Sequence, residues 1–316
     1  MVRAKAVVKY LGYILQFNAV FLFISAAISF AEGENSLNTL LASAVSSTVV
    51  GLIPHFLIGK TGGINFQEGL VISVLGWITV CITGMIPYYL WGGEFTLANA
   101  LFESVSGYTT TGASILEDVE ALPKGLLFWR SSTSFIGGIG IILFVLLVLP
   151  EKRGAISSFY RVEISDLSKM SFTTRGKHVT RVIAAVYLSL IVALTILLQV
   201  FGMSFFDAVC HSFTTVATSG FSTKNLSIAF YDNIGIELVI LFFMLISSMH
   251  FGLIYDTMTT KKNNLFTSRT TRMYVFVMLI GIFLIALQLT SENIFEFSTS
   301  LRYAAFQVVS LASTTG

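Results

Sequence analysis

Three short stretches of one pattern decide how this chain folds: LFESVSGYTTTG at 101–112, VCHSFTTVATSG at 209–220 and AFQVVSLASTTG at 305–316. Each stretch ends in a small residue, a Thr, a Thr or Ser, and a Gly. A small hydroxyl residue also stands six positions before each glycine. A single Thr-Thr-Gly is commonplace, but three copies in register indicate an internal repeat.

The sequence around these stretches is that of a membrane protein. Of its 316 residues 54% are hydrophobic and 11% charged, against about 25% charged in a typical soluble domain. Mean hydropathy is +0.81, which excludes an ordinary soluble enzyme and a disordered chain. Continuous apolar runs of about 20 residues favour membrane-spanning helices over the short alternating strands of a β-barrel. We expect seven spans, at 10–30, 38–58, 69–90, 125–149, 179–201, 233–255 and 273–290.

The basic residues predict the orientation. If the N-terminus is cytoplasmic and the spans alternate, the inner side holds all but four of the 19 Lys and Arg residues, namely Lys124, Arg130, Lys224 and Arg302. Lys and Arg concentrate on the cytoplasmic side of membrane proteins. We expect the apolar run after the basic N-terminus to be a first membrane span and not a cleaved signal peptide, because it is longer than the apolar run of a typical signal peptide.

The first two repeated stretches lie between two spans on the outer side, and the third follows the last span on that side. Each is too short to cross as a helix. Non-helical backbone at membrane depth is tolerated only where it lines a polar pathway or is buried in protein. Glycine lets a loop turn successive carbonyls inward, and the C-terminal end of a short helix carries about −0.5 charge. These features predict a site for a cation, in which rings of carbonyls replace the ion's hydration shell.

The predicted fold class is therefore an all-α polytopic membrane protein. It consists of tandem span–pore helix–filter loop–span repeats, preceded by two extra transmembrane helices. Expected units are 1–62 (two leading helices), 63–175 (first repeat), 176–262 (second repeat) and 263–316 (an incomplete third repeat). The expected ion-binding residues are Thr109, Thr110, Thr111, Gly112, Ala217, Thr218, Ser219, Gly220, Ser313, Thr314, Thr315 and Gly316.

Four segments carry a family resemblance: SVSGYTTTGAS at 104–114, LPKGLLFWRSSTSFIGGIGII at 122–142, HSFTTVATSGFSTKN at 211–225 and SLASTTG at 310–316. The chain resembles the Trk/Ktr/HKT superfamily of potassium transporters, above all its bacterial TrkH-type membrane subunits. The resemblance implies four repeats around one pore, K⁺ as the transported ion, and uptake across the bacterial cytoplasmic membrane. The chain stops on the third glycine, so we expect a truncated sequence.

The resemblance also implies partners. A TrkA-like, nucleotide-binding regulatory subunit is expected on the cytoplasmic face, at the polar loops 151–178 and 256–272, and the intact subunit is expected to be a homodimer. The lipid bilayer is the other partner. A net charge of +2 does not indicate binding to nucleic acid. No organic cofactor is expected. Glycine at all three filter positions favours K⁺ over Na⁺, because Ser at the first position accompanies Na⁺ transport in the plant branch of the superfamily.

Three alternative functions make different demands on the sequence. An ion-coupled secondary transporter would show inverted repeats and ionisable residues inside its spans. An intramembrane enzyme would need a catalytic motif such as H-E-x-x-H or G-x-S-x-G, and neither occurs. A non-conducting fragment remains a third possibility. The sequence leaves open whether transport is channel-like or coupled.

Some residues allow two interpretations. Glu103, Arg130 and Arg302 lie in or near membrane segments, where charges are costly, and each is either a paired structural charge or part of the ion pathway. The stretch IGGIG at 136–140 is interpreted as helix packing more readily than as gating. Trp91 and Trp129 are expected near the outer interface, where aromatic residues gather.

Overall fold

The structure is a computed structural model that describes residues 2–59, 61–148, 176–249, 251, 253–254, 257 and 264–316. Every regular element within these residues is a helix. The helices are α1 (Ala4–Ala31), α2 (Leu37–Leu57), α3 (Phe66–Gly84), α4 (Ile86–Trp91), α5 (Leu97–Tyr108), α6 (Lys124–Val148), α9 (Gly176–Val200), α10 (Phe205–Val216), the 3₁₀ helix η1 (Ser227–Tyr231), α11 (Ile234–Ser247), α13 (Asn264–Thr267), α14 (Arg269–Ser291) and α15 (Phe297–Ala312).

Most of the predicted spans are present as long apolar helices. Among the described residues five stretches are long and apolar enough to cross a membrane, at Ala4–Ala31, Leu37–Leu57, Gln67–Trp91, Ile183–Val200 and Arg269–Ser291. The 25-residue α6 coincides with the span expected at 125–149. These helices confirm the all-helical membrane class of fold.

The span expected at 233–255 contains a break in its helix, and the described residues 251, 253–254 and 257 beyond the break are helical again. Its regular helix, α11, ends at Ser247 after 14 residues, about 21 Å at 1.5 Å per residue. The Ser248 hydroxyl contacts the Tyr274 hydroxyl on α14 at 2.6 Å. Helix α11 alone is therefore shorter than the hydrocarbon core of about 30 Å.

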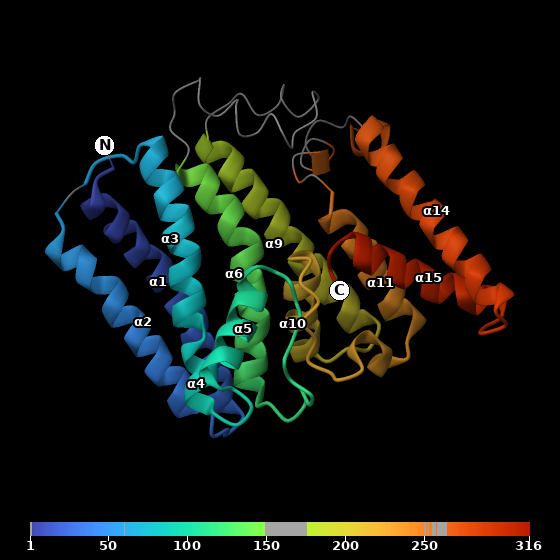
Figure 1. The fold of residues 1–316 in the computed structure, drawn as a ribbon, viewed down its shortest axis with the longest axis horizontal. Coiled ribbons are helices and arrows are strands. Elements are labelled where there is room, and N and C mark those ends of the chain that lie inside the picture. The colour runs from blue at the N-terminus through green and yellow to red at the C-terminus, as the bar shows by residue number, and fades with distance from the viewer. Residues whose placement is uncertain are drawn as a thin grey trace.

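The helices pack in three groups (Figure 1). Helices α3, α5 and α6 contact one another, as do α9, α10 and α11, while α14 packs on α15. The second long helix of each group packs on the short helix of the next: α6 contacts α10, and α11 contacts α15. This relation places the three short helices around a common centre, where the C-terminal end of the chain also lies.

The leading pair, α1 and α2, packs on the first group. Glu34, between these two helices, accepts hydrogen bonds from the backbone N–H groups of Lys124 and Gly125 at 2.6 and 3.0 Å. A carboxylate at a helix N-terminus satisfies unpaired N–H groups and complements the helix dipole. At mid-depth the Tyr108 hydroxyl donates to the buried Asn18 at 2.5 Å, so α1 supports the last residue of α5.

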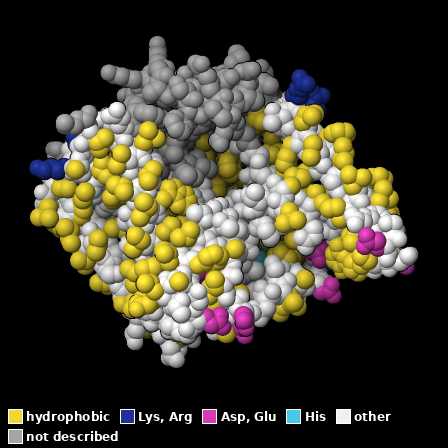
Figure 2. Space-filling model, in the orientation of Figure 1, with side chains coloured by type: hydrophobic (Ala, Val, Ile, Leu, Met, Phe, Trp, Pro, Cys, Tyr) yellow, Lys and Arg dark blue, Asp and Glu magenta, His cyan; other side chains and the backbone are white. Residues whose placement is uncertain are grey.

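Charge and apolar surface are separated on the molecule. Figure 2 shows hydrophobic side chains across the visible face, Lys and Arg at its upper edge, and Asp and Glu toward its lower edge. The upper edge is where α1 and α14 begin. An apolar band between two charged rims is the surface expected of a chain that crosses a bilayer.

Trp129, expected near the outer interface, packs between helices. Its side chain is fully buried, and its indole N–H donates to the Gly84 carbonyl at 3.1 Å. The ring packs edge-on against Tyr108. A large aromatic residue at this depth contributes to the core between α3, α5 and α6.

Candidate functional site

The three short helices end in the same way. In α5 the Thr110 N–H donates to the Gly107 carbonyl at 3.0 Å and the Thr111 N–H to the Ser106 carbonyl at 2.9 Å. These two bonds define the Schellman motif of a helix C-terminus. The same pair of bonds recurs after α10, from Thr218 and Ser219, and after α15, from Thr314 and Thr315.

This cap requires left-handed backbone at a residue that is not glycine. Thr110, Thr218 and Thr314 have φ of 55°, 53° and 62°. Glycine usually occupies this position, because a side chain in the left-handed region costs roughly 1–2 kcal/mol. Three β-branched residues held in the same strained conformation mark a functional backbone, which composition alone does not reveal.

The cap leaves the loop carbonyls without partners. The N–H groups of the loop residues turn back to the helix, from Thr109 to Val105 at 2.9 Å and from Gly112 to Ser106 at 3.4 Å in the first copy. Within the described part of the chain, no protein donor bonds to the carbonyls of residues 109–112, 217–220 or 313–316. Each loop therefore offers oxygen atoms at the negative end of a helix dipole, which suits a cation.

The glycines allow the loops to meet. A Cβ on Gly112 would lie 1.6 Å from the Ser219 carbonyl oxygen, and a Cβ on Gly220 would lie 2.0 Å from that of Thr315. Both glycines also have positive φ, 74° and 90°. The first loop thus touches the second and the second touches the third, at distances that exclude any side chain.

Hydroxyl groups form hydrogen bonds within or next to each loop. Thr109 and Thr111 bond to each other at 2.8 Å, and Ser313 and Thr315 do the same at 2.8 Å. In the second loop Ala217 replaces the first hydroxyl. Ser219 bonds instead to Ser134 of α6 at 2.7 Å. The predicted residues of each loop are therefore brought together.

Sequence reasoning missed Ser134 as a supporting residue. Its signal was the hydroxyl run Ser131–Ser134 inside the otherwise apolar α6, where all four side chains are buried. A cluster of hydroxyls on a membrane helix indicates a contact with other polar groups. In α6, Ser134 makes that contact with the second loop.

Two hollows adjoin the loops. One of about 250 Å³ is lined by Thr109, Thr110, Ala217 and Thr218 together with Gly137, Gly138 and Tyr187. The other, of about 370 Å³, lies between the first and third loops and is lined by Thr109, Thr110, Thr111, Leu311, Thr314 and Gly316. The loops therefore border open volume on two sides.

The glycines of α6 serve packing, as the sequence suggests. A Cβ on Gly137 would lie 2.0 Å from the Tyr108 carbonyl oxygen, and one on Gly138 would lie 3.0 Å from the Cβ of Ala217, which caps α10. Gly140 has no described atom within 4 Å of such a Cβ. Two of the three glycines thus let α6 approach the ends of α5 and α10.

The charges near the site are paired. Arg130 binds Glu103, and Arg302 binds Glu237 of α11 at 2.5 Å. These contacts support the structural interpretation over a place in the ion pathway. No group of three or more His, Cys, Asp or Glu side chains is arranged to hold a metal ion among the described residues.

The fold defines a helical membrane protein with three loops of one pattern, and comparison with known proteins gives its family. The family model of TrkH, described as a cation transport protein, matches residues 38–316. The chain belongs to this TrkH family.

Relatives named Trk system potassium uptake protein TrkH occur in Halomonas elongata and Salmonella typhimurium. They are 33% and 34% identical over 255 and 261 residues, which cover 79% and 81% of this chain. The matches cover 52% and 54% of those proteins, so the chain spans about half the length of the curated relatives it matches.

The fold is also that of a solved structure. The crystal structure of the potassium transporter TrkH from Vibrio parahaemolyticus matches the whole chain with a TM-score of 0.88, at 24% identity. The match covers 65% of that protein. This likeness supports the arrangement of the helices.

Proposed function

We propose that this chain forms part of a potassium uptake system and that K⁺ crosses the membrane between its three loops. The ion would be held by backbone carbonyls of residues 109–112, 217–220 and 313–316. One observation carries this proposal: the N–H groups at three helix ends turn inward to the helix, which leaves the carbonyls free. Desolvating a unit charge costs of order 20 kcal/mol in the idealised case, and carbonyl rings can replace the lost hydration.

Two observations support K⁺ as the ion. All three loops carry glycine at the equivalent position, and the relatives from Halomonas elongata and Salmonella typhimurium are named for potassium uptake. The expected units 1–62, 63–175, 176–262 and 263–316 are part of the same proposal, in which each repeat supplies one loop. The grouping of the helices supports this division.

The membrane side and the partners are also proposals. The separation of basic and acidic rims supports a cytoplasmic N-terminus in a bacterial inner membrane. A TrkA-like regulatory subunit would dock on the inner loops 151–178 and 256–272. Residues 151–175, 256 and 258–263 of these loops lie outside the described part of the chain. A homodimer is the proposed assembly.

The test is potassium rescue in a bacterium that lacks its own potassium uptake systems. Cells that express the natural gene are expected to grow in low potassium and to take up ⁸⁶Rb⁺. The variant Gly220→Ala, which would place a Cβ 2.0 Å from the Thr315 oxygen, is expected to lose both. Growth that depends on Na⁺ or on a proton gradient would favour coupled transport. Absent growth and absent uptake, despite normal membrane abundance of the wild type, would contradict the proposal.

A further inference from the structure

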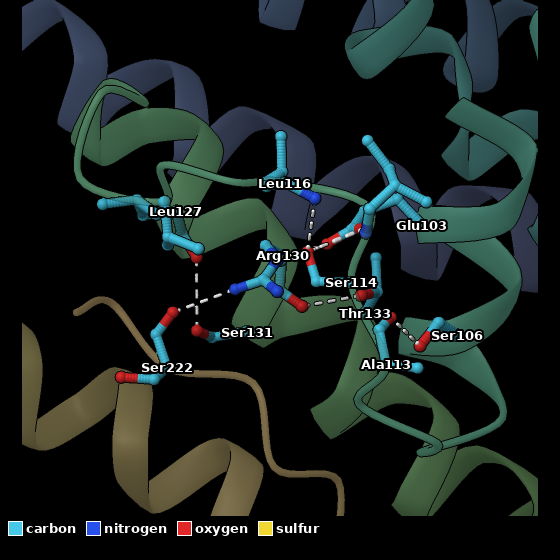
Figure 3. A network of polar contacts seen from close by, with 12 residues as sticks. Glu103, Ser106, Ala113, Ser114, Leu116, Leu127, Arg130, Ser131, Thr133 and Ser222 are labelled. Atoms are coloured by element: carbon cyan, nitrogen blue, oxygen red, sulfur yellow. Dashed lines mark hydrogen bonds and ion pairs between the residues drawn. The ribbon is translucent and has the colours of Figure 1, made fainter. Parts of the chain in front are cut away.

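A buried polar network lies behind the loops and is separate from their carbonyls (Figure 3). Glu103 of α5 is fully buried. Its two carboxylate oxygens accept the Ser114 hydroxyl at 3.0 and 3.2 Å, and one of them accepts the Ile115 N–H at 3.2 Å. The first loop is thereby tied to its own short helix just after Gly112.

The second repeat makes the same contact with different chemistry. His211 stands nine residues before Gly220, as Glu103 stands nine before Gly112. Its Nε2 lies 3.1 Å from the hydroxyl of Ser222, which stands two residues after the glycine, as Ser114 does. Its Nδ1 lies 2.8 Å from the Asp207 carbonyl oxygen, so Nδ1 carries a proton. Nε2 of the neutral ring then accepts from the serine.

Arg130 joins the two contacts. Its Nε donates to Glu103 at 2.5 Å, and its Nη1 donates to the Ser222 carbonyl at 2.9 Å. The guanidinium carbon lies 3.7 Å from the centre of the Phe221 ring. The side chain is 3% exposed. One planar group thus contacts the middle of α5, at Glu103, and the segment that follows Gly220, at Ser222.

A lysine could not make these contacts together. The guanidinium presents several donors in a fixed plane and stacks on aromatic rings, whereas an ammonium is a single point charge. Breaking the pair by removing one partner would leave a buried unpaired charge. The link to the second repeat therefore depends on arginine at this position, whereas the pairing with Glu103 depends only on a positive charge.

We propose that Glu103, Arg130 and His211 form a brace that holds the outer ends of the first two loops in register, as positioning residues for ion selectivity. The brace rests on the proposed function, since selectivity has meaning only if the loops conduct. The hydrogen bonds of the brace can be tested without ion transport. The amide of Ile115 donates to Glu103 at 3.2 Å and that of Lys224 to the Ser222 hydroxyl at 3.0 Å, and both bonds protect these amides from hydrogen exchange. Both amides report the brace without any ion flux.

The decisive variant is Arg130→Lys, which retains a positive charge beside Glu103 and loses the link to Ser222. The matched control is Ser131→Ala, on the next residue, whose hydroxyl donates to the Leu127 carbonyl at 3.2 Å and makes no hydrogen bond to Glu103, His211 or Ser222. The double variant Glu103→Gln with Arg130→Gln removes both charges together, so no unpaired charge is buried. Gln307, at the equivalent position of the third repeat, shows that an amide is accommodated there.

Two measurements are made on the full-length protein in lipid nanodiscs or vesicles. In Arg130→Lys the preference for K⁺ over Na⁺ is expected to fall about tenfold, as for the loss of one charge-assisted hydrogen bond. Hydrogen exchange at Ile115 and Lys224 is expected to speed up together. Ser131→Ala is expected to change neither.

The outcomes separate the two proposals. If wild-type protein carries no K⁺, the proposed function fails, and hydrogen exchange still decides the brace. If wild-type protein carries K⁺ but Arg130→Lys keeps both its selectivity and its exchange rates, the brace is wrong. Faster exchange at Ile115 alone would also overturn it, because the second loop would then be held independently. The neutral double variant should lose selectivity while folding normally, and unchanged selectivity there would count against the brace.

Discussion

Replacing Gly112 with alanine tests the closest contact in the site. The new Cβ would lie 1.6 Å from the Ser219 carbonyl oxygen, and real Cβ contacts essentially never fall below 3.0 Å. That oxygen, which belongs to the second loop, would have to move by about 1.4 Å, the difference of these two distances. The φ of 74° adds roughly 1–2 kcal/mol of backbone strain for a residue with a side chain.

These magnitudes predict a large functional effect. A misplacement of about 1 Å in a preorganised enzyme site costs about 100-fold. We therefore expect ⁸⁶Rb⁺ uptake by Gly112→Ala to fall by about 100-fold. Gly112→Ser is expected to weaken discrimination between K⁺ and Na⁺ as well.

Gly33 provides a matched control. It has a similar φ of 69°, and a Cβ there would meet no atom within 4 Å. Gly33→Ala therefore imposes the backbone strain without the collision, and its uptake per molecule in the membrane is expected to be normal. Equal uptake by the Gly112 and Gly33 variants, at equal membrane abundance, would refute the reasoning from loop contact.

Three further predictions concern the surroundings of the loops. Gly137→Ala, whose Cβ would lie 2.0 Å from a carbonyl at the end of α5, should reduce ⁸⁶Rb⁺ uptake, whereas Gly140→Ala should not; equal effects would contradict the packing role. Ser219→Ala removes a buried 2.7 Å bond to α6 and should lower the free energy of unfolding by about 1 kcal/mol in denaturation; no change would mean that the bond is not formed. A hydrogen bond from the Asn225 amide lowers the pKa of Asp118 in the folded protein. This contact therefore stabilises the fold at pH values above the pKa of Asp118 in the unfolded chain, about 3.9, and its contribution is lost as the pH falls through the lowered pKa of the folded protein. Asp118→Ala should accordingly lower the melting temperature at pH 7 and leave it unchanged at a pH well below the lowered pKa of Asp118. An equal loss at the two pH values would exclude a contribution from the charged carboxylate.

Hydropathy predicts the long helices well, because a bilayer imposes length and apolarity on every span. The expected span 38–58 is the helix Leu37–Leu57. The expected span 10–30 begins earlier, at Ala4, since Lys5 and Lys9 lie at the end of the helix rather than before it. The regular helix expected at 233–255 ends at Ser247, and hydropathy contains no signal for that end.

The loops could be predicted in place but not in conformation. Glycine at three equivalent positions indicates a loop, yet the left-handed residue of each cap is the threonine two positions earlier. The sequence contains a partial signal for the contact between Glu103 and Ser114, because a serine stands two residues after both Gly112 and Gly220. Arg130 reaches the second repeat through tertiary packing, which a single sequence does not encode in any local pattern.

The most direct test of the account is to locate the ion. The protein would be crystallised in Rb⁺, and the anomalous signal of rubidium would be mapped, with Na⁺ crystals as the control. The account predicts a peak at the centre of the loops 109–112, 217–220 and 313–316, in contact with their carbonyl oxygens and absent in Na⁺. Rubidium bound elsewhere at saturating concentration, with no peak between these loops, would contradict it.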